Sequence, residues 1–161
     1  MQIAVQVLQD EIHKRSNLFL PVIDKSSSEG KQIIAVGVEG RMDKFPESWK
    51  AAISEMPETG EDGYKIAILE TNRIIIAGHD ERGALYGVGR LLRKLDMHNG
   101  MVLVPENLSI SSTPVYPIRG HQMGYRPKTN AYDAWSVAQY DTYIRDLAIF
   151  GANSIEIMPP R

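Results

Sequence analysis

The sequence predicts an α+β fold, in which helices pack on a small mixed β-sheet, followed by a separate βαβ unit. Residues 1–112 alternate between helical and strand patterns and close with two short strands, an order typical of α+β domains. Residues 113–117 hold two prolines, which disfavour helix in the residue before them and interrupt strand pairing, so they mark a boundary. Residues 118–158 then give strand, polar loop, helix and strand, the order of a βαβ unit of a parallel sheet. We therefore expect two parts, residues 1–112 and 113–161.

The first part opens with a predicted helix over residues 3–16. Its apolar residues recur every three or four positions along one face. They are Ala4, Val5, Leu8 and Ile12. Residues 18–23 could add a short strand, which Pro21 would restrict to a sheet edge. Residues 31–38 are β-branched and apolar on both faces, a pattern that predicts a central strand.

A second helix is predicted over residues 46–56, with a proline near its first turn. Residues 64–70 and 73–78 are predicted to pair as a tight hairpin, because the asparagine between them tolerates turn geometry. Asp80 is expected to cap a third helix over residues 81–95. Two short strands, 101–104 and 108–111, form the predicted closing pair.

Four glycines around the third helix raise the question of a phosphate-binding loop. They are Gly78, Gly83, Gly87 and Gly89. A phosphate loop needs Gly-x-x-x-x-Gly-Lys followed by Ser or Thr, but Ala84 follows Gly83 here. A dinucleotide fingerprint would precede the helix, whereas these glycines lie inside it. Close packing of the helix on the sheet is the interpretation that fits them.

The second part contains a predicted strand over 118–123, a polar loop over 125–135, a helix over 137–150 and a strand over 153–158. Ser136 and Gln139 match a capping box, which contributes about 1 kcal/mol at a helix start. Gly151 suits the helix C-terminus. The helix residues expected to face inward are Val137, Tyr140, Ile144, Leu147 and Ala148.

Composition excludes several classes of function. The 161 residues are 43% hydrophobic and 24% charged, with a net charge of −2 and interspersed signs, so no charged field attracts nucleic acid or a membrane surface. The absence of cysteine excludes disulfides and zinc–thiolate sites, and the four histidines lack metal-ligand spacing, so neither metal nor cofactor is expected. No apolar run is long enough to span a membrane. The N-terminus has no signal-peptide pattern, which leaves two interpretations: a cytoplasmic protein, or an exported one whose leader is not included in this sequence.

The loop of the second part is rich in groups that bind sugars. Aromatic faces stack on sugar rings, and arginine, asparagine and aspartate form directional hydrogen bonds to hydroxyls. The loop also follows the C-terminal end of a strand, where sites form in parallel α/β sheets and in eight-fold barrels. An equally good interpretation is a solvated loop with structural tyrosines. The candidate substrate-binding residues, including those on the two strands, are Arg119, His121, Tyr125, Arg126, Asn130, Asp133, Trp135 and Glu156.

Residues 63–95 resemble a known domain. They contain Gly-Tyr-Lys-Ile-Ala-Ile and then Arg-Gly-Ala-Leu-Tyr-Gly-Val, and they resemble the N-terminal, non-catalytic α/β domain of hexosaminidase-type and α-glucuronidase-type glycoside hydrolases. Residues 8–12 are similar to the start of that domain. Residues 116–120 (Tyr-Pro-Ile-Arg-Gly) look like the phrase that begins the catalytic (β/α)8 barrel, and residues 151–157 like its second strand.

The resemblance implies an accessory domain over residues 1–112 and the truncated start of a catalytic barrel over 113–161. The catalytic carboxylates of this group lie at later barrel strands, so the chain alone is expected to be inactive. Arg119 matches the first-strand arginine that holds the terminal sugar in the hexosaminidase type, and His121 follows by position. After Gly120 the sequence departs from the hexosaminidase pattern of an aspartate followed by Arg-His. The implied partners are a carbohydrate and the rest of the barrel.

A second hypothesis treats the chain as a non-catalytic module that binds carbohydrate or another protein. Its last strand would then be an exposed apolar edge, and such edges are usually protected or paired. This hypothesis predicts that a second copy of the chain, or another partner, covers Ile155 and Ile157.

Overall fold

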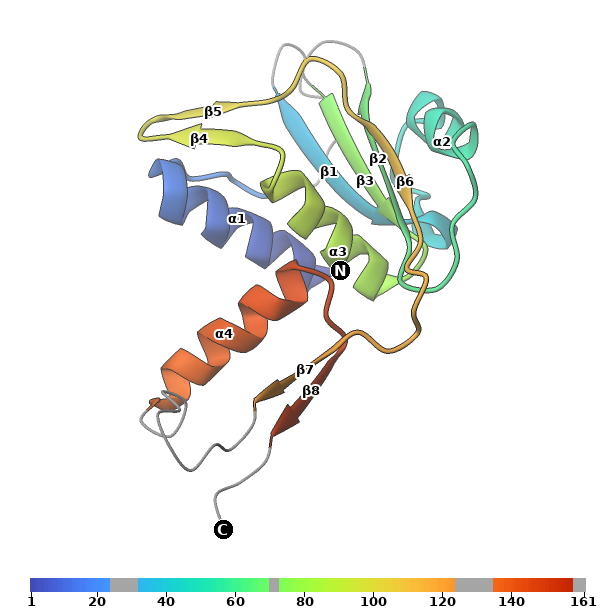
Figure 1. Ribbon diagram of the computed structural model, residues 1–161. Coiled ribbons are helices and arrows are strands. Elements are labelled where there is room, and N and C mark those ends of the chain that lie inside the picture. The colour runs from blue at the N-terminus through green and yellow to red at the C-terminus, as the bar shows by residue number, and fades with distance from the viewer. Residues whose placement is uncertain (24–31, 70–72, 124–134, 158–161) are drawn as a thin grey trace. The chain divides into compact units, whose positions relative to one another are not determined.

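The computed structural model describes residues 1–23, 32–69, 73–123 and 135–157, and Figure 1 shows the arrangement of their helices and strands. The chain divides into two compact units, Met1–Pro114 and Val115–Arg161. The first unit contains α1 (Gln2–Ser16), β1 (Ile33–Val38), η1 (Glu39–Arg41), α2 (Glu47–Ser54), β2 (Tyr64–Leu69), β3 (Arg73–Gly78), α3 (Glu81–Leu92), β4 (Asp96–His98), β5 (Met101–Leu103) and β6 (Ser109–Ser112). The second contains β7 (Gly120–Met123), α4 (Val137–Ile149) and β8 (Ser154–Ile157).

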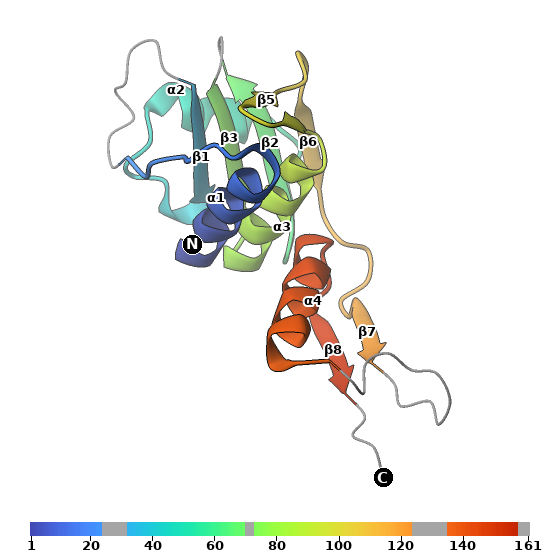
Figure 2. The ribbon, with the colours of Figure 1, turned by 90° about the vertical axis from the view of Figure 1, so that its left-hand side faces the viewer.

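A four-stranded mixed sheet organises the first unit. Its strand order is β1-β3-β2-β6, with β1 parallel to β3 and the other pairs antiparallel. Helices α1 and α3 lie side by side on one face of this sheet, and α2 lies on the other (Figures 1 and 2). The predicted α+β class, with helices packed on a small mixed sheet, is confirmed.

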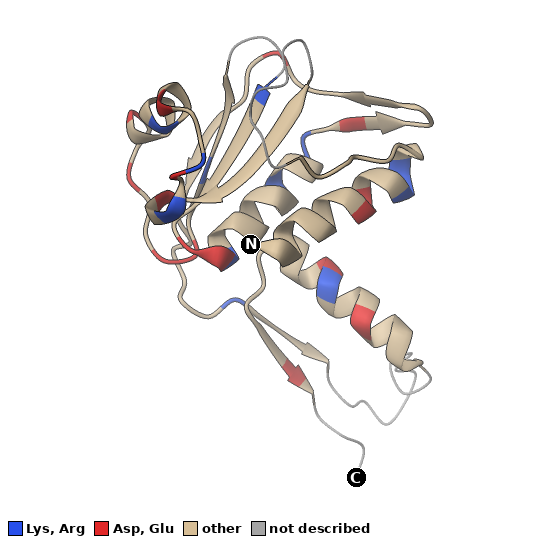
Figure 3. Cartoon of the chain, turned by 180° about the vertical axis from the view of Figure 1, so that it is seen from behind, with Lys and Arg blue, Asp and Glu red and all other residues tan. Residues whose placement is uncertain are grey.

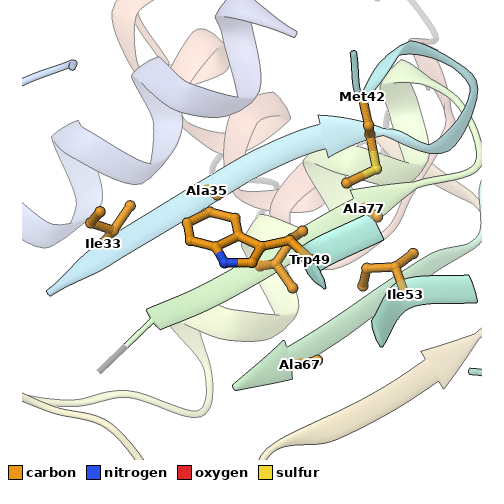
Figure 4. Close-up of a cluster of buried hydrophobic side chains, with 8 residues drawn as sticks. Ile33, Ala35, Met42, Trp49, Ile53, Ala67 and Ala77 are labelled. Carbon is orange, nitrogen blue, oxygen red and sulfur yellow. The ribbon is translucent and has the colours of Figure 1, made fainter. Parts of the chain in front are cut away.

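The α2 face of the sheet is closed by a cluster of buried apolar side chains (Figure 4). Trp49 and Ile53 of α2 are 4% and 3% exposed, and they pack on side chains that alternate along the strands. The sheet residues of this cluster are Ile33, Ala35, Ala67, Ile75 and Ala77. Alanines at the strand centres leave room for the indole, so a short helix suffices to cover this face.

The opposite face depends on glycines at the start of α3. A Cβ atom on Gly83 would overlap the carbonyl oxygen of Gly63, and one on Gly78 would overlap the backbone nitrogen of Ala84. Further along the helix, a Cβ on Gly87 would lie 2.6 Å from Cγ2 of Ile76. The helix backbone therefore rests directly on the sheet, which confirms the packing interpretation of these glycines.

Asp80 fixes the first turn of α3 in this position. Its Oδ1 accepts from the Gly83 amide at 2.8 Å, as the predicted cap requires, and its Oδ2 accepts from the Asp62 amide at 2.8 Å. Partial burial raises the pKa of this carboxyl, but backbone N–H groups of Asp62, Gly83 and Arg82 outweigh that effect and hold the pKa below its ordinary value. An ionised Asp80 thus joins the loop before β2 to the helix after β3.

Three strand predictions for the first unit are corrected by the structure. Strand β1 lies at an edge of the sheet rather than in its centre, and it is apolar on both faces because helices cover both faces. Residues 18–23 form no strand; Phe19 and Val22 in this segment are 79% and 70% exposed. The expected closing pair does not form, because β5 pairs with β4, which the sequence pattern did not reveal, while β6 joins β2.

The second unit is a β7–α4–β8 unit in which β7 and β8 run parallel. The capping box is present: Ser136 Oγ accepts from the Gln139 amide, and the Gln139 side chain accepts from the Ser136 amide at 2.8 Å. Gly151 has a φ of 95°, in the left-handed region that favours glycine after a helix. Val137, expected to face inward, is 77% exposed instead, because it occupies the first turn of α4.

Charged side chains of both signs are interspersed over the face of the first unit shown in Figure 3. Within the described ranges, no helix is long and apolar enough to cross a membrane. The expected absence of one extended charged surface agrees with this view, and the helices have the length and polarity of a packed domain.

We predict that Gly83→Ala destabilises the first unit by about 1–3 kcal/mol, because the new methyl group overlaps backbone that cannot move aside. Alanine has the higher helix propensity, so propensity alone predicts the opposite sign. Urea unfolding followed by circular dichroism measures the change. Gly40→Ala is the matched control, since no atom lies within 4 Å of its added Cβ. Equal stability of the two variants would contradict the proposed packing constraint.

Candidate functional site

The frame of the candidate site is the pair of strands β7 and β8. They align as Gly120 with Ser154, His121 with Ile155, Gln122 with Glu156 and Met123 with Ile157. Side chains alternate between the two faces of such a pair, so His121 and Gln122 point to opposite sides. Both strands end in the same direction, and the predicted sugar-binding loop follows the end of β7.

His121 lies on the face that contacts α4. Its Nε2 atom is 3.1 Å from the hydroxyl oxygen of Tyr143, and the two rings meet edge to face with centroids 5.6 Å apart. Met123, on the same face, is 3% exposed. His121 therefore anchors the strand to the helix, through a tyrosine that the sequence prediction did not include.

Trp135 belongs to the same group of rings. Its ring lies edge to face with Tyr143 and with Tyr140, at centroid distances of 5.1 and 5.5 Å. These contacts stack the residue that precedes the helix cap onto the first two turns of α4. We call His121, Trp135, Tyr140 and Tyr143 the aromatic cluster. The three-residue spacing of the two tyrosines is the sequence signal that could have revealed it.

Arg119 lies immediately before β7, at the amino-terminal end of the strand. Its guanidinium donates to the carbonyl oxygens of Gly151 at 2.9 Å and Tyr116 at 2.8 Å. Its backbone N–H donates to Oδ1 of Asn153 at 2.9 Å, and its carbonyl accepts from the Asn153 amide at 3.0 Å. These bonds tie the segment before β7 to the segment before β8. The sugar-binding role inferred for Arg119 stays a prediction.

Gln122 and Glu156 lie on the face of the strand pair that does not bear His121. They are aligned in the register, both are exposed, and the Gln122 Nε2 atom donates to Glu156 Oε2 at 3.1 Å. Sequence analysis identified Glu156 but missed Gln122, because their proximity depends on the register of the two strands.

Four candidate residues lie outside the described part of the chain and stay predictions. They are Tyr125, Arg126, Asn130 and Asp133. Among the described residues, no group of three or more His, Asp or Glu side chains is arranged to hold a metal ion.

Together these features define an α+β domain joined to a βαβ unit with a polar strand face and an aromatic cluster. The family model described as "Glycosyl hydrolase family 67 N-terminus" matches residues 1–91, and the chain belongs to this family. The predicted resemblance to the N-terminal domain of glycoside hydrolases is thereby confirmed.

Two solved structures share the fold at low sequence identity. A glycoside hydrolase family 20 β-N-acetylglucosaminidase aligns with a TM-score of 0.59 and 18% identity over 96% of this chain. A family GH115 4-O-methyl-α-glucuronidase with specificity for decorated arabinogalactans aligns with a TM-score of 0.65 and 13% identity over 97% of this chain. The chain spans 24% and 23% of their lengths. No curated protein matches the sequence.

We predict that Tyr143→Phe weakens the attachment of α4 to β7 by about 0.5–1.5 kcal/mol, since it removes the hydroxyl partner of His121 but keeps the ring. Hydrogen exchange of the α4 amides measures this as faster local opening. Tyr116→Phe, at a tyrosine that is 72% exposed, is the control and leaves the exchange unchanged. Equal protection of α4 in both variants would remove the basis for this anchoring contact.

Proposed function

We propose that this chain is the N-terminal part of a glycoside hydrolase that acts on oligo- or polysaccharides. In this proposal, residues 1–112 form an accessory domain and residues 113–161 open the catalytic (β/α)8 barrel. The observation that carries it is the parallel β7–α4–β8 unit directly after a domain of the glycosyl hydrolase family 67 N-terminus family.

The strand pairing supports a larger sheet. A two-stranded parallel sheet leaves backbone groups unpaired at both outer edges, and parallel sheets occur almost always with both faces covered. Further βα units would pair these edges and close the sheet on itself. The fraction of each solved structure that the chain spans, 24% and 23%, leaves room for such units.

The reaction itself requires groups from later strands. Glycoside hydrolysis generally uses two carboxyl groups placed across the scissile bond, roughly 5 to 9.5 Å apart. Glu156 is the only carboxylate on β7 and β8. We therefore propose that residues 1–161 alone are inactive and that the remaining barrel supplies the catalytic pair.

Substrate contacts are proposed at the carboxyl ends of the strands, as in other (β/α)8 barrels. The aromatic cluster supports this placement, because it holds Trp135 between the predicted sugar-binding loop and α4. The two solved structures are named for different sugars, an N-acetylglucosaminide and a methylglucuronide, so both substrate classes remain within the proposal.

The proposal is tested by reading the coding sequence beyond Arg161 and assaying both products. We expect several hundred further residues with alternating strands and helices. The longer protein is expected to hydrolyse an aryl α-glucuronide or an aryl β-N-acetylglucosaminide, whereas purified residues 1–161 show no turnover. Turnover by residues 1–161 at the rate of the longer protein would overturn the predicted inactivity.

The alternative, a non-catalytic module that dimerises through β8, is favoured by one observation. Ile157 is 58% exposed although it belongs to a strand. This alternative predicts that residues 1–161 elute as a dimer in size-exclusion chromatography and that Ile157→Lys converts the dimer to a monomer. A monomer at all concentrations, with β8 amides protected from exchange, would exclude it.

A further inference from the structure

The open face of the β7–β8 pair carries a run of small and polar residues. Side-chain alternation places four residues of the two strands on this face, away from His121 and α4. They are Gly120, Gln122, Ser154 and Glu156, and all four are exposed. In a barrel built on this unit, the face opposite the helix is the one that points to the barrel interior.

This composition differs from that of an ordinary barrel core. The interior of a (β/α)8 barrel is normally filled by layers of bulky Val, Ile and Leu side chains. Here the first two strands offer glycine and serine at one level, and then an amide and a carboxylate at the next level towards the carboxyl ends. A buried carboxylate needs a partner that donates hydrogen bonds, so this level is suited to a polar ligand.

We propose that Gln122 and Glu156 form a pair that binds neighbouring hydroxyls of an uncharged sugar ring and disfavours a uronate carboxylate at the same position. The inference rests on the proposed function, because the rest of the barrel must enclose this face. It adds Gln122 to the site and states which part of a substrate the pair accepts.

The chemistry follows from the hydrogen bond between the two side chains. An ionised carboxylate only accepts, so the Gln122 amide must donate to it, as the 3.1 Å contact shows. The amide oxygen of Gln122 and the carboxylate of Glu156 then both serve as acceptors towards a ligand. Two adjacent sugar hydroxyls supply two O–H donors. A uronate carboxylate supplies no donor and repels the negative charge of Glu156.

The test uses the full-length protein and three methyl glycosides: the glucoside, the N-acetylglucosaminide and the glucuronoside. Calorimetric titration gives the ratio of the Kd for the glucuronoside to the Kd for the tighter neutral glycoside. We expect Glu156→Gln to lower this ratio by about tenfold, because it removes the charge and keeps the shape. Gln122→Ala is expected to weaken the neutral glycoside by about tenfold. Asp141→Asn, an equal change of charge at an exposed position of α4, is expected to leave the ratio unchanged.

Each result decides between the possibilities. An unchanged ratio in Glu156→Gln, or an equal change in Asp141→Asn, overturns the assignment of this pair. Aryl-glycoside hydrolysis that proceeds normally in such a case keeps the proposed function while the pair fails. Full-length protein that neither hydrolyses an aryl glycoside nor binds any of the three sugars overturns the proposed function, and the pair with it.

Discussion

The first unit depends on a backbone-to-backbone contact at the start of α3. The Gly83 Cα packs against the Gly63 carbonyl, which also accepts from the His79 amide at 2.9 Å. Asp80 adds hydrogen bonds to the amides on both sides of this contact. The contact sets how closely α3 approaches the sheet, and Val88, Leu91 and Leu92 are buried as a result. Helix α1 packs on α3 and so depends on the same contact.

The other face of the sheet is fixed by a buried charge rather than by glycines. Lys65 of β2 is 3% exposed, and its Nζ atom lies 3.2 Å from Glu39 Oε2 and 3.2 Å from the carbonyl oxygen of Ile53. One ammonium group thereby joins β2 to η1 and to the end of α2. Removing either partner would leave a buried polar group unsatisfied, which costs more than the hydrogen bond contributes. The short helix α2 is therefore held by both Trp49 packing and this ion pair.

Local signals in the sequence predicted most of the fold, whereas pairing over distance was beyond their reach. The four helices, the β2–β3 hairpin and the caps at Asp80 and Ser136 follow from periodicity and capping chemistry within a few residues. The edge position of β1 could not be predicted, because an apolar pattern reports covered faces and not neighbouring strands. In the second unit, Glu156 was predicted from its position on a strand, but its partner Gln122 depends on a register that only the fold supplies.

The same distinction explains why the candidate site divides into two groups of residues. Arg119 donates to the carbonyls of Tyr116 and Gly151, so its guanidinium holds together the segments that precede the two strands. The aromatic cluster attaches α4 to β7 on one face, and it leaves the opposite face to Gln122 and Glu156. Strand alternation separates the groups that hold the unit together from those able to meet a ligand. A single βαβ unit can therefore be rigid on its helix side while it keeps a polar face for the chemistry that later strands complete.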